Sequence, residues 1–250
     1  MSGHSKWATI KRQKGVADAR RGQMFTKLAR ELEIAARDGG GDPAMNFRLR
    51  LVMDKAKQAN MPKDNIERAI LRGTGELKGE VIEEINYEGY GPQGTALIVE
   101  VLTDNRNRSV SDVRSAFSRH GGNLGETGCV AWLFERKGYI SLVPQDDDAD
   151  ELALMAIDAG ADDIKMDKDL VEVFTRVEDL QRVKETLTQS DIPIDTAELS
   201  WVPKSMVQLN EKATLQNMRL IDALEELEDV QRVYSNLEIS DEVMAAYEAE

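Results

Sequence analysis

The sequence predicts an α+β fold of three domains: an N-terminal three-helix domain and two ferredoxin-like α/β sandwich domains, one inserted into the other. Three observations predict it. Apolar residues recur at helical spacing up to about residue 74, and β-rich segments alternate with helical ones from residue 80 onwards. The segment 137–204, the inserted domain, has the complete element order βαββαβ.

The helical domain is expected over residues 23–79. Its first helix, over 23–37, has an apolar stripe at 3.6-residue spacing and a basic ridge on the opposite side. The stripe consists of Phe25, Leu28, Ala29, Leu32, Ala35 and Ala36, and the ridge of Lys27, Arg30 and Arg37. The ridge is therefore expected to face outward.

Turn residues separate the other two helices of this domain. The glycines of "DGGGD" end the first helix, and Asp42–Pro43 resembles an N-cap followed by proline at the first helical position. The second helix then extends to about Ala59, with Met45 on its apolar side. A third helix is expected between Pro62 and Gly73.

The first α/β domain is expected to be discontinuous, over 80–136 and 205–240. Strand-forming residues dominate "VIEEINYEGY" and "TALIVEVLT", a helix with Ser109 as its N-cap follows, and another strand is expected around Val130–Glu135. This run lacks a helix and a strand to complete its sandwich. The helical segment 212–227 and the strand-like "VQRVYSNLE" after it can supply both.

Charge is distributed unevenly along the chain. Residues 1–75 contain 16 Lys and Arg against 8 Asp and Glu, which leaves 16 basic and 38 acidic residues of the totals of 32 and 46 for the remainder. The net charge is thus +8 for the first part, −22 for the second and −14 for the whole chain. This asymmetry favours a polyanion as the partner of the basic part. Residues 1–22 have no apolar periodicity and are expected to form a flexible basic arm.

Composition argues against several classes of protein. No run of about 18 apolar residues exists, so no membrane span is expected. The single cysteine, Cys129, excludes an internal disulfide framework and favours a reducing, cytoplasmic location. The N-terminus lacks the apolar segment of a secretory signal, although its basic character is also compatible with an organelle transit peptide. A monomer is expected because no heptad pattern stands out.

No constellation of catalytic residues is evident, so the sequence argues against an enzyme. "GYGPQG" at 89–94 matches the dinucleotide fingerprint literally, but a β-branched strand follows it instead of a helix, so a hairpin turn is expected. His4 and His120 are the only histidines, and with one cysteine they cannot form a metal cluster. No cofactor and no metal are expected. A Cys129–His120 pair and carboxylate-only sites stay open as alternatives.

The first group of candidate nucleic-acid-binding residues comes from the arm and the first helix. Basic side chains there can neutralise phosphates, which releases counterions and makes binding depend on salt. Trp7 either stacks on an unpaired base or docks the arm onto the protein as an apolar peg. The group consists of Lys6, Trp7, Lys11, Arg12, Lys14, Arg20, Arg21, Lys27 and Arg30.

The second group lies in "TDNRNRSVSDVRSAFSRHGGNLG", within the acidic part of the chain. It consists of Arg106, Arg108, Arg114, Arg119, Gly121 and Gly122. A glycine pair lets another backbone approach closely, as in RNA-clamping loops. The alternative is a tight helix-to-strand turn beside surface arginines.

The chain contains five segments of specific sequence: "GHSKWATIKRQKGVADARRGQMFTKLARE", "DPAMNFRLRLVMDKAKQANMPKDNIERAI", "YEGYGPQG", "TDNRNRSVSDVRSAFSRHGGNLGETGCVAWLFERKG" and "ALEELEDVQRVYSNLE". Together they resemble the YebC/PmpR family, which includes the mitochondrial translational activator of cytochrome c oxidase. The resemblance covers essentially the whole chain. It implies a helical domain followed by two α+β domains, one inserted in the other, and a non-enzymatic role in gene expression without catalytic residues.

The resemblance leaves two functions open. Bacterial members have carried the label of DNA-binding transcriptional regulator, whereas organelle relatives and some bacterial members look like translation factors that act on ribosomes stalled on proline-rich nascent chains. The residues alone predict a polyanion binder with an acidic body. We favour the ribosome, through rRNA and tRNA, because a basic arm with a lone tryptophan suits irregular RNA better than a duplex. A sequence-specific DNA regulator is the alternative.

Overall fold

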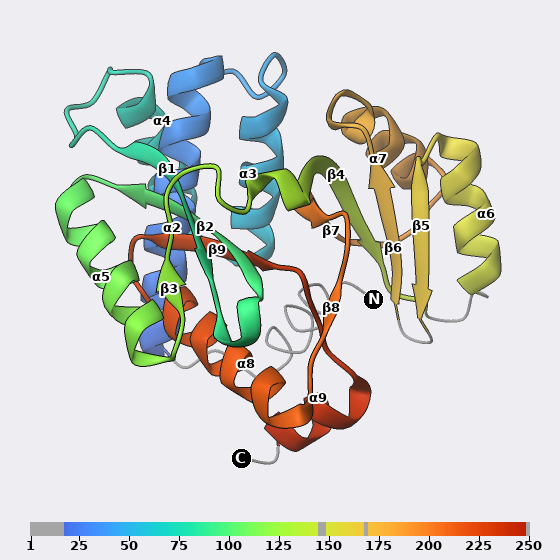
Figure 1. Ribbon diagram of the computed structural model, residues 1–250. Coiled ribbons are helices and arrows are strands. Elements are labelled where there is room, and N and C mark those ends of the chain that lie inside the picture. Colours follow the sequence, from blue (N-terminus) through green and yellow to red (C-terminus); the bar gives the residue numbers. More distant parts are fainter. Residues whose placement is uncertain (1–17, 145–148, 168–169, 249–250) are drawn as a thin grey trace. The chain divides into compact units, whose positions relative to one another are not determined.

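A computed structural model describes residues 18–144, 149–167 and 170–248 of the protein. Its helices and strands carry the labels used in Figure 1. The chain divides into two compact units. Phe134–Lys204 forms one unit, and the segments before and after it together form the other. The larger unit contains a helical domain and an α/β domain.

The helical domain is built around one long helix. Helix α2 (Asp18–Gly39) packs against both α3 (Phe47–Gln58) and α4 (Lys63–Gly73). The apolar stripe expected from the sequence supplies the core, because Leu28, Leu32, Ala35 and Ala36 are all buried against residues of the two shorter helices. Burial of each large apolar side chain contributes about 1.5–3 kcal/mol, so this stripe holds the three helices together.

Two helix starts differ from the sequence prediction. Helix α2 is already present at Asp18, the first described residue, so the last residues of the expected 1–22 arm are helical. Helix α3 begins after Asn46, whose side chain accepts from Leu49 N and donates to Ala35 O. The expected cap at Asp42–Pro43 is wrong: the Asp42 side chain accepts from Ala44 N in a separate turn. Met45 is consequently 84% exposed.

The α/β domain of the larger unit is a four-stranded antiparallel sheet with helices on both faces. The strands are β1 (Glu83–Tyr90), β2 (Ala96–Thr103), β3 (Asn123–Leu124) and β9 (Val230–Ser235), in the order β3-β1-β2-β9. Helices α5 (Arg106–Arg119) and α8 (Glu211–Glu225) share the main apolar core with β2 and β9.

Helix α2 reaches the sheet through a second apolar cluster. Ile34 of α2 packs with Ile82 and with Leu102 of β2. Strand β2 is therefore buried along its whole length, which explains why "ALIVEVLT" is nearly continuous in apolar residues. The expected hairpin at "GYGPQG" is confirmed, because β1 and β2 pair directly on either side of the short turn Pro92–Gly94.

The C-terminal segment adds three short elements to this unit. Strand β8 (Val207–Gln208) pairs in parallel with β10 (Leu237–Glu238), and α9 (Asp241–Glu248) follows. Met244 of α9 is buried in the main core. The sequence prediction ended at residue 240 and did not include α9.

The smaller unit has the ferredoxin-like order. Its elements are β4 (Phe134–Leu142), α6 (Ala149–Ala159), β5 (Asp163–Asp167), β6 (Leu170–Thr175), α7 (Leu180–Gln189) and β7 (Ile194–Pro203), and its antiparallel sheet has the strand order β5-β6-β4-β7. Strand β4 begins at Phe134, three residues before the expected domain boundary. The separate strand expected around Val130–Glu135 does not form, because Ala131–Leu133 is a turn that leads directly into β4.

Candidate nucleic-acid interface

The predicted binding residues of the arm lie outside the described part of the chain. These are Lys6, Trp7, Lys11, Arg12 and Lys14. Arg20 and Arg21 lie in the first turn of α2, and Arg21 is exposed. The proposed contribution of the arm to binding therefore stays a prediction, and the described residues bear only on α2 and α5.

Two residues of the basic ridge of α2, Lys27 and Arg30, do not face outward as expected, whereas Arg37 is exposed. Lys27 Nζ donates to Glu225 O at 2.6 Å, and Arg30 forms ion pairs with Glu228 at 3.1 Å and with Asp229 at 2.9 Å. The Arg30 side chain is only 13% exposed. Hydrogen bonds between charged groups are among the strong ones, so Lys27 and Arg30 join α2 to the end of α8 and to the segment that follows it. These side chains have an intramolecular role that sequence reasoning did not foresee.

Asp229 is the centre of this contact. Its side chain is 7% exposed and accepts from Ser109 Oγ at 2.7 Å, from Thr103 Oγ1 at 3.1 Å and from the Arg108 guanidinium at 2.9 Å, in addition to Arg30. Burial alone would raise the pKa of this carboxyl, but the hydrogen bonds from Ser109 and Arg108 and the nearby positive charges outweigh it and lower the pKa. The ionised carboxylate therefore joins α2, α5 and the end of β2.

Arg108 takes part in the same network. Its guanidinium contacts Asp229 and also Asp104 at 2.7 Å, and these contacts, Asp229 first, raise the pKa of the group. The expected N-cap Ser109 is wrong for a related reason. Asn105 caps α5 by accepting from Arg108 N, while the Ser109 hydroxyl is buried against Asp229. We name the set Arg30, Thr103, Arg108, Ser109 and Asp229 the Asp229 cluster.

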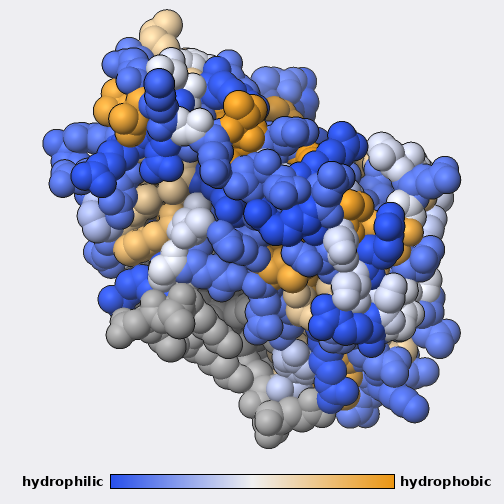
Figure 2. All heavy atoms as spheres, turned by 90° about the vertical axis from the view of Figure 1, so that its left-hand side faces the viewer, coloured by the Kyte–Doolittle hydropathy of each residue, from blue (hydrophilic) through white to orange (hydrophobic). Residues whose placement is uncertain are grey.

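Three predicted arginines are exposed on α5. Arg106, Arg114 and Arg119 are all exposed, and Arg119 Nε donates to Ser115 O at 3.3 Å. Hydrophilic side chains predominate on the face of the molecule drawn in Figure 2, where the apolar groups are small and separate. Arg106, Arg114 and Arg119 are therefore available to a charged, hydrated partner such as a phosphate backbone.

The glycine pair after α5, Gly121 and Gly122, is required by the geometry of the turn there. Gly121 has φ +77°, a left-handed conformation, and Gly122 N donates to Phe117 O at 2.9 Å, which closes the helix end. A Cβ at Gly122 would lie 2.7 Å from Tyr90 O, because the chain crosses β1 closely here. The pair thus accounts for a tight helix-to-strand turn, which was the alternative to a nucleic-acid clamp.

Sequence reasoning missed Glu88 and Trp132. Buried Glu88 on β1 accepts from Gly128 N, Val130 N and Ala131 N at 2.7–2.8 Å. These three amides cannot join a sheet, which is why no strand forms at Val130. Trp132 lies next to this anchored loop, donates to Cys129 O and is 65% exposed. An exposed indole held by a rigid loop is a candidate base-stacking surface. The sequence did contain a signal for Glu88: in "NYEGY" a glutamate stands on the inward side of an expected strand.

Comparison with known proteins places the chain in a family. A family model described as "TACO1/YebC protein N-terminal domain" matches residues 5–76, and one described as "TACO1/YebC second and third domain" matches residues 82–237. The chain belongs to the TACO1/YebC family.

Full-length relatives support this membership. A protein of Desulfosudis oleivorans named "Probable transcriptional regulatory protein" is 54% identical over 97% of this chain and 99% of its own length. A protein of the same description from Dehalococcoides mccartyi is 51% identical over the full length of both chains. The crystal structure of a conserved hypothetical protein from Aquifex aeolicus has a TM-score of 0.84 and 48% identity, covering 90% of this chain and 93% of its own.

TACO1/YebC membership confirms the resemblance seen in the sequence and the predicted α+β fold class. The names of the relatives describe regulatory proteins. Within the residues that the structure describes, no three His, Cys, Asp or Glu side chains form a group that could hold a metal ion. No helix among those residues is long and apolar enough to cross a membrane.

Proposed function

We propose that this protein is a non-enzymatic, nucleic-acid-binding regulator of gene expression. The observation that carries the proposal is the segregation of charge: an excess of +8 in residues 1–75 and exposed Arg106, Arg114 and Arg119 on α5, within a chain of net charge −14. Positive charge concentrated in this way attracts a polyanion, while the acidic remainder repels phosphate and restricts where it can bind.

The specific target that we propose is RNA of the ribosome. The described residues that support this choice are the exposed arginines of α5 and the exposed Trp132. Exposed arginines and an exposed tryptophan suit unpaired bases and irregular backbones. Following the family resemblance, the role at the ribosome is relief of stalling on proline-rich nascent chains.

The alternative is a DNA-binding transcriptional regulator. The observation that favours it is the printed name of the relatives, which calls them probable transcriptional regulatory proteins at about half identity over full length. The names favour this alternative over the ribosome, whereas the exposed arginines of α5 and the exposed Trp132 favour RNA.

One experiment separates the two. The purified protein is sedimented with ribosomes through sucrose and, in parallel, tested in gel shifts against promoter DNA and random DNA of equal length, each over a series of salt concentrations. Ribosome association that weakens with salt, together with equal, weak binding to both DNAs, supports the RNA proposal. Sequence-selective DNA binding at physiological salt without ribosome association overturns it in favour of transcription.

A further inference from the structure

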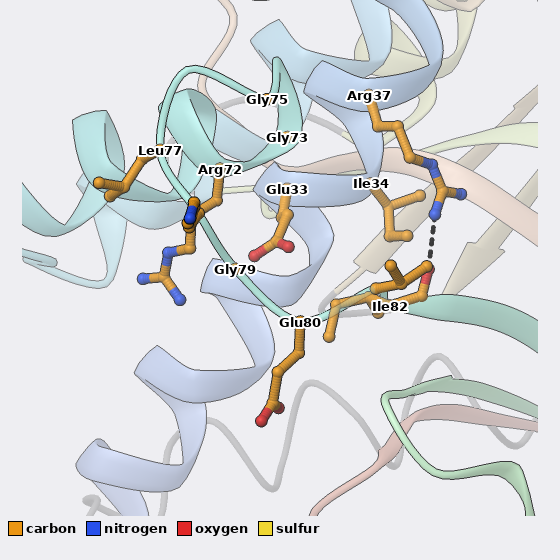
Figure 3. A pocket seen from close by; sticks show the side chains of 12 residues that line it. Glu33, Ile34, Arg37, Arg72, Gly73, Gly75, Leu77, Gly79, Glu80 and Ile82 are labelled. Atoms are coloured by element: carbon orange, nitrogen blue, oxygen red, sulfur yellow. Dashed lines mark hydrogen bonds between the residues drawn. The ribbon is translucent and has the colours of Figure 1, made fainter.

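A cavity of about 270 Å³ lies between α2, α4 and the linker that leads to β1 (Figure 3). Drug-sized ligands fill pockets of roughly 300–1,000 Å³, so this cavity has room for one flat ring system. Its polar lining comes from Glu33 and Arg37 of α2, Arg72 of α4, and Lys78 and Glu80 of the linker. Ile34 and Ile82 provide an apolar wall beside them.

Glu33 is the buried polar group of this cavity. The residue is 9% exposed, and its carboxylate points into the space between Arg72 and Glu80 in Figure 3. Within the described part of the chain, no hydrogen bond or ion pair joins this carboxylate to a donor. Burial raises the pKa of Glu33, although the charges of Arg72, Arg37 and Arg30 act in the opposite direction. The carboxylate opens onto the cavity, so a ligand that donates two hydrogen bonds can meet both of its oxygens.

Arg72 of α4 also lines the cavity. Its stem lies across the linker, since a Cβ at Gly79 would be 2.9 Å from Arg72 Cδ. Arg37 is held at the other side of the cavity by hydrogen bonds to Ile82 O and Asp38. The lining therefore includes a pair of acceptors at Glu33, the basic residue Arg72 and the exposed Lys78.

We infer that this cavity binds one unpaired guanine base. The Watson–Crick edge of guanine presents two adjacent donors, N1–H and the 2-amino group, next to the O6 acceptor. A carboxylate accepts from the two donors while an arginine donates to O6. Adenine, cytosine and uracil each lack two adjacent ring-edge donors, so they leave Glu33 without its second hydrogen bond.

The source of the base rests on the proposed function: we take it to be a guanosine of the bound nucleic acid, with a free guanine nucleotide as the other source. The first probes are GMP and IMP, measured by isothermal titration calorimetry on the full chain. IMP lacks only the 2-amino group. The second probes are single-stranded oligouridylates that carry one central guanosine or one central inosine, measured by fluorescence anisotropy.

The variants are Glu33→Gln and Arg72→Gln. Glutamine keeps the volume of Glu33 and removes a desolvated charge, so the fold is retained. Arg68→Gln is the matched control, because Arg68 is an exposed arginine of α4 that does not line the cavity. Thermal unfolding of each variant checks that the helical domain is intact.

The wild-type protein is expected to bind GMP about tenfold more tightly than IMP, in the range that one bidentate base contact provides. Glu33→Gln abolishes this preference, Arg72→Gln weakens GMP binding, and Arg68→Gln changes neither. The guanosine oligonucleotide binds more tightly than the inosine one by a similar factor.

Two other outcomes distinguish this inference from the proposed function. Tight binding of both oligonucleotides without any preference for guanosine over inosine, and no GMP preference, overturns the guanine cavity while nucleic-acid binding stands. A GMP preference that depends on Glu33, with no binding of either oligonucleotide, supports a free-nucleotide site and contradicts the proposed RNA binding.

Discussion

Arg30 of α2 has the same chemistry as Arg106 and Arg114 of α5 but different surroundings. Arg30 is 13% exposed and paired with Asp229 and Glu228, whereas Arg106 and Arg114 are exposed. Both groups contribute equally to a charge count. The difference shows that in an acidic protein some basic residues pair with the protein's own carboxylates, and only the remaining ones can bind a polyanion. Changing one side chain at a time separates these two uses of arginine.

The largest effect is expected for Asp229→Asn. Removing this charge leaves Arg30 and Arg108 without their shared carboxylate and weakens the bonds from Ser109 and Thr103, so unfolding free energy should fall by about 3 kcal/mol. Urea denaturation monitored by circular dichroism measures it. Glu228→Gln is the matched control, because this exposed partner of Arg30 should contribute less than about 1 kcal/mol. Equal effects of the two variants would contradict a central role for Asp229.

The stability lost in Asp229→Asn should depend on pH in one direction. The folded-state pKa of Asp229 is lowered, so its contribution is fully present above the unfolded pKa of about 4 and is lost as pH falls through the lower folded value. The difference between wild type and variant should therefore be constant from pH 7 to 5 and shrink below pH 4. A difference that stays constant down to pH 2.5 would show that ionisation of Asp229 is not what stabilises the fold.

An intermediate effect is expected for Glu88→Gln. The amide retains one acceptor oxygen and places an NH₂ group against backbone donors, so about 2 kcal/mol of stability should be lost. Amide exchange should accelerate at Gly128, Val130 and Ala131, which donate to Glu88. Exposed Glu126 in the same loop provides the control, and Glu126→Gln should leave these amides protected.

The smallest effect on stability is expected for Arg114→Gln, within about 0.5 kcal/mol of wild type. Its effect on binding should be clear, because loss of one phosphate contact lowers the salt dependence of affinity by about one unit. Arg30→Gln should show the reverse pattern, with lower stability and an unchanged salt slope. Binding of single-stranded RNA at several salt concentrations, with urea denaturation of each variant, gives both readouts. Identical behaviour of the two variants would remove the distinction between Arg30 and Arg114.

The fold class was predictable because the spacing of apolar residues along the sequence reflects which side of each helix or strand is buried. The stripe of Leu28, Leu32 and Ala35 and the continuous apolar run of β2 each reflect a surface that must be covered. Element ends were less predictable, since Asp42 and Asn46 are equally good caps on local grounds. Asn46 is the cap, and its side chain also donates to Ala35 O of α2, a contact with another helix that the local sequence does not indicate.

The site was harder to predict than the fold. Composition indicated where positive charge is concentrated, but the pairing of Arg30 and Arg108 with Asp229 joins residues up to 199 positions apart in the chain. No local pattern records such a contact. The same holds for Glu33, whose place in a cavity depends on α4 and the linker folding back over α2.

The ends of the smaller unit have a consequence for folding. Phe134 and Pro203 pair directly in the β4–β7 ladder, so this unit begins and ends at neighbouring positions. Once the ferredoxin-like unit has folded, Leu133 and Lys204 are joined as if by a short loop instead of a long one. Loop-closure entropy rises with loop length by about 0.6 kcal/mol for each doubling. Early folding of the insert thus lowers the entropic cost of bringing α8 and β9 back to β2, and the sequence separation across the insert overstates how slowly the larger unit must assemble.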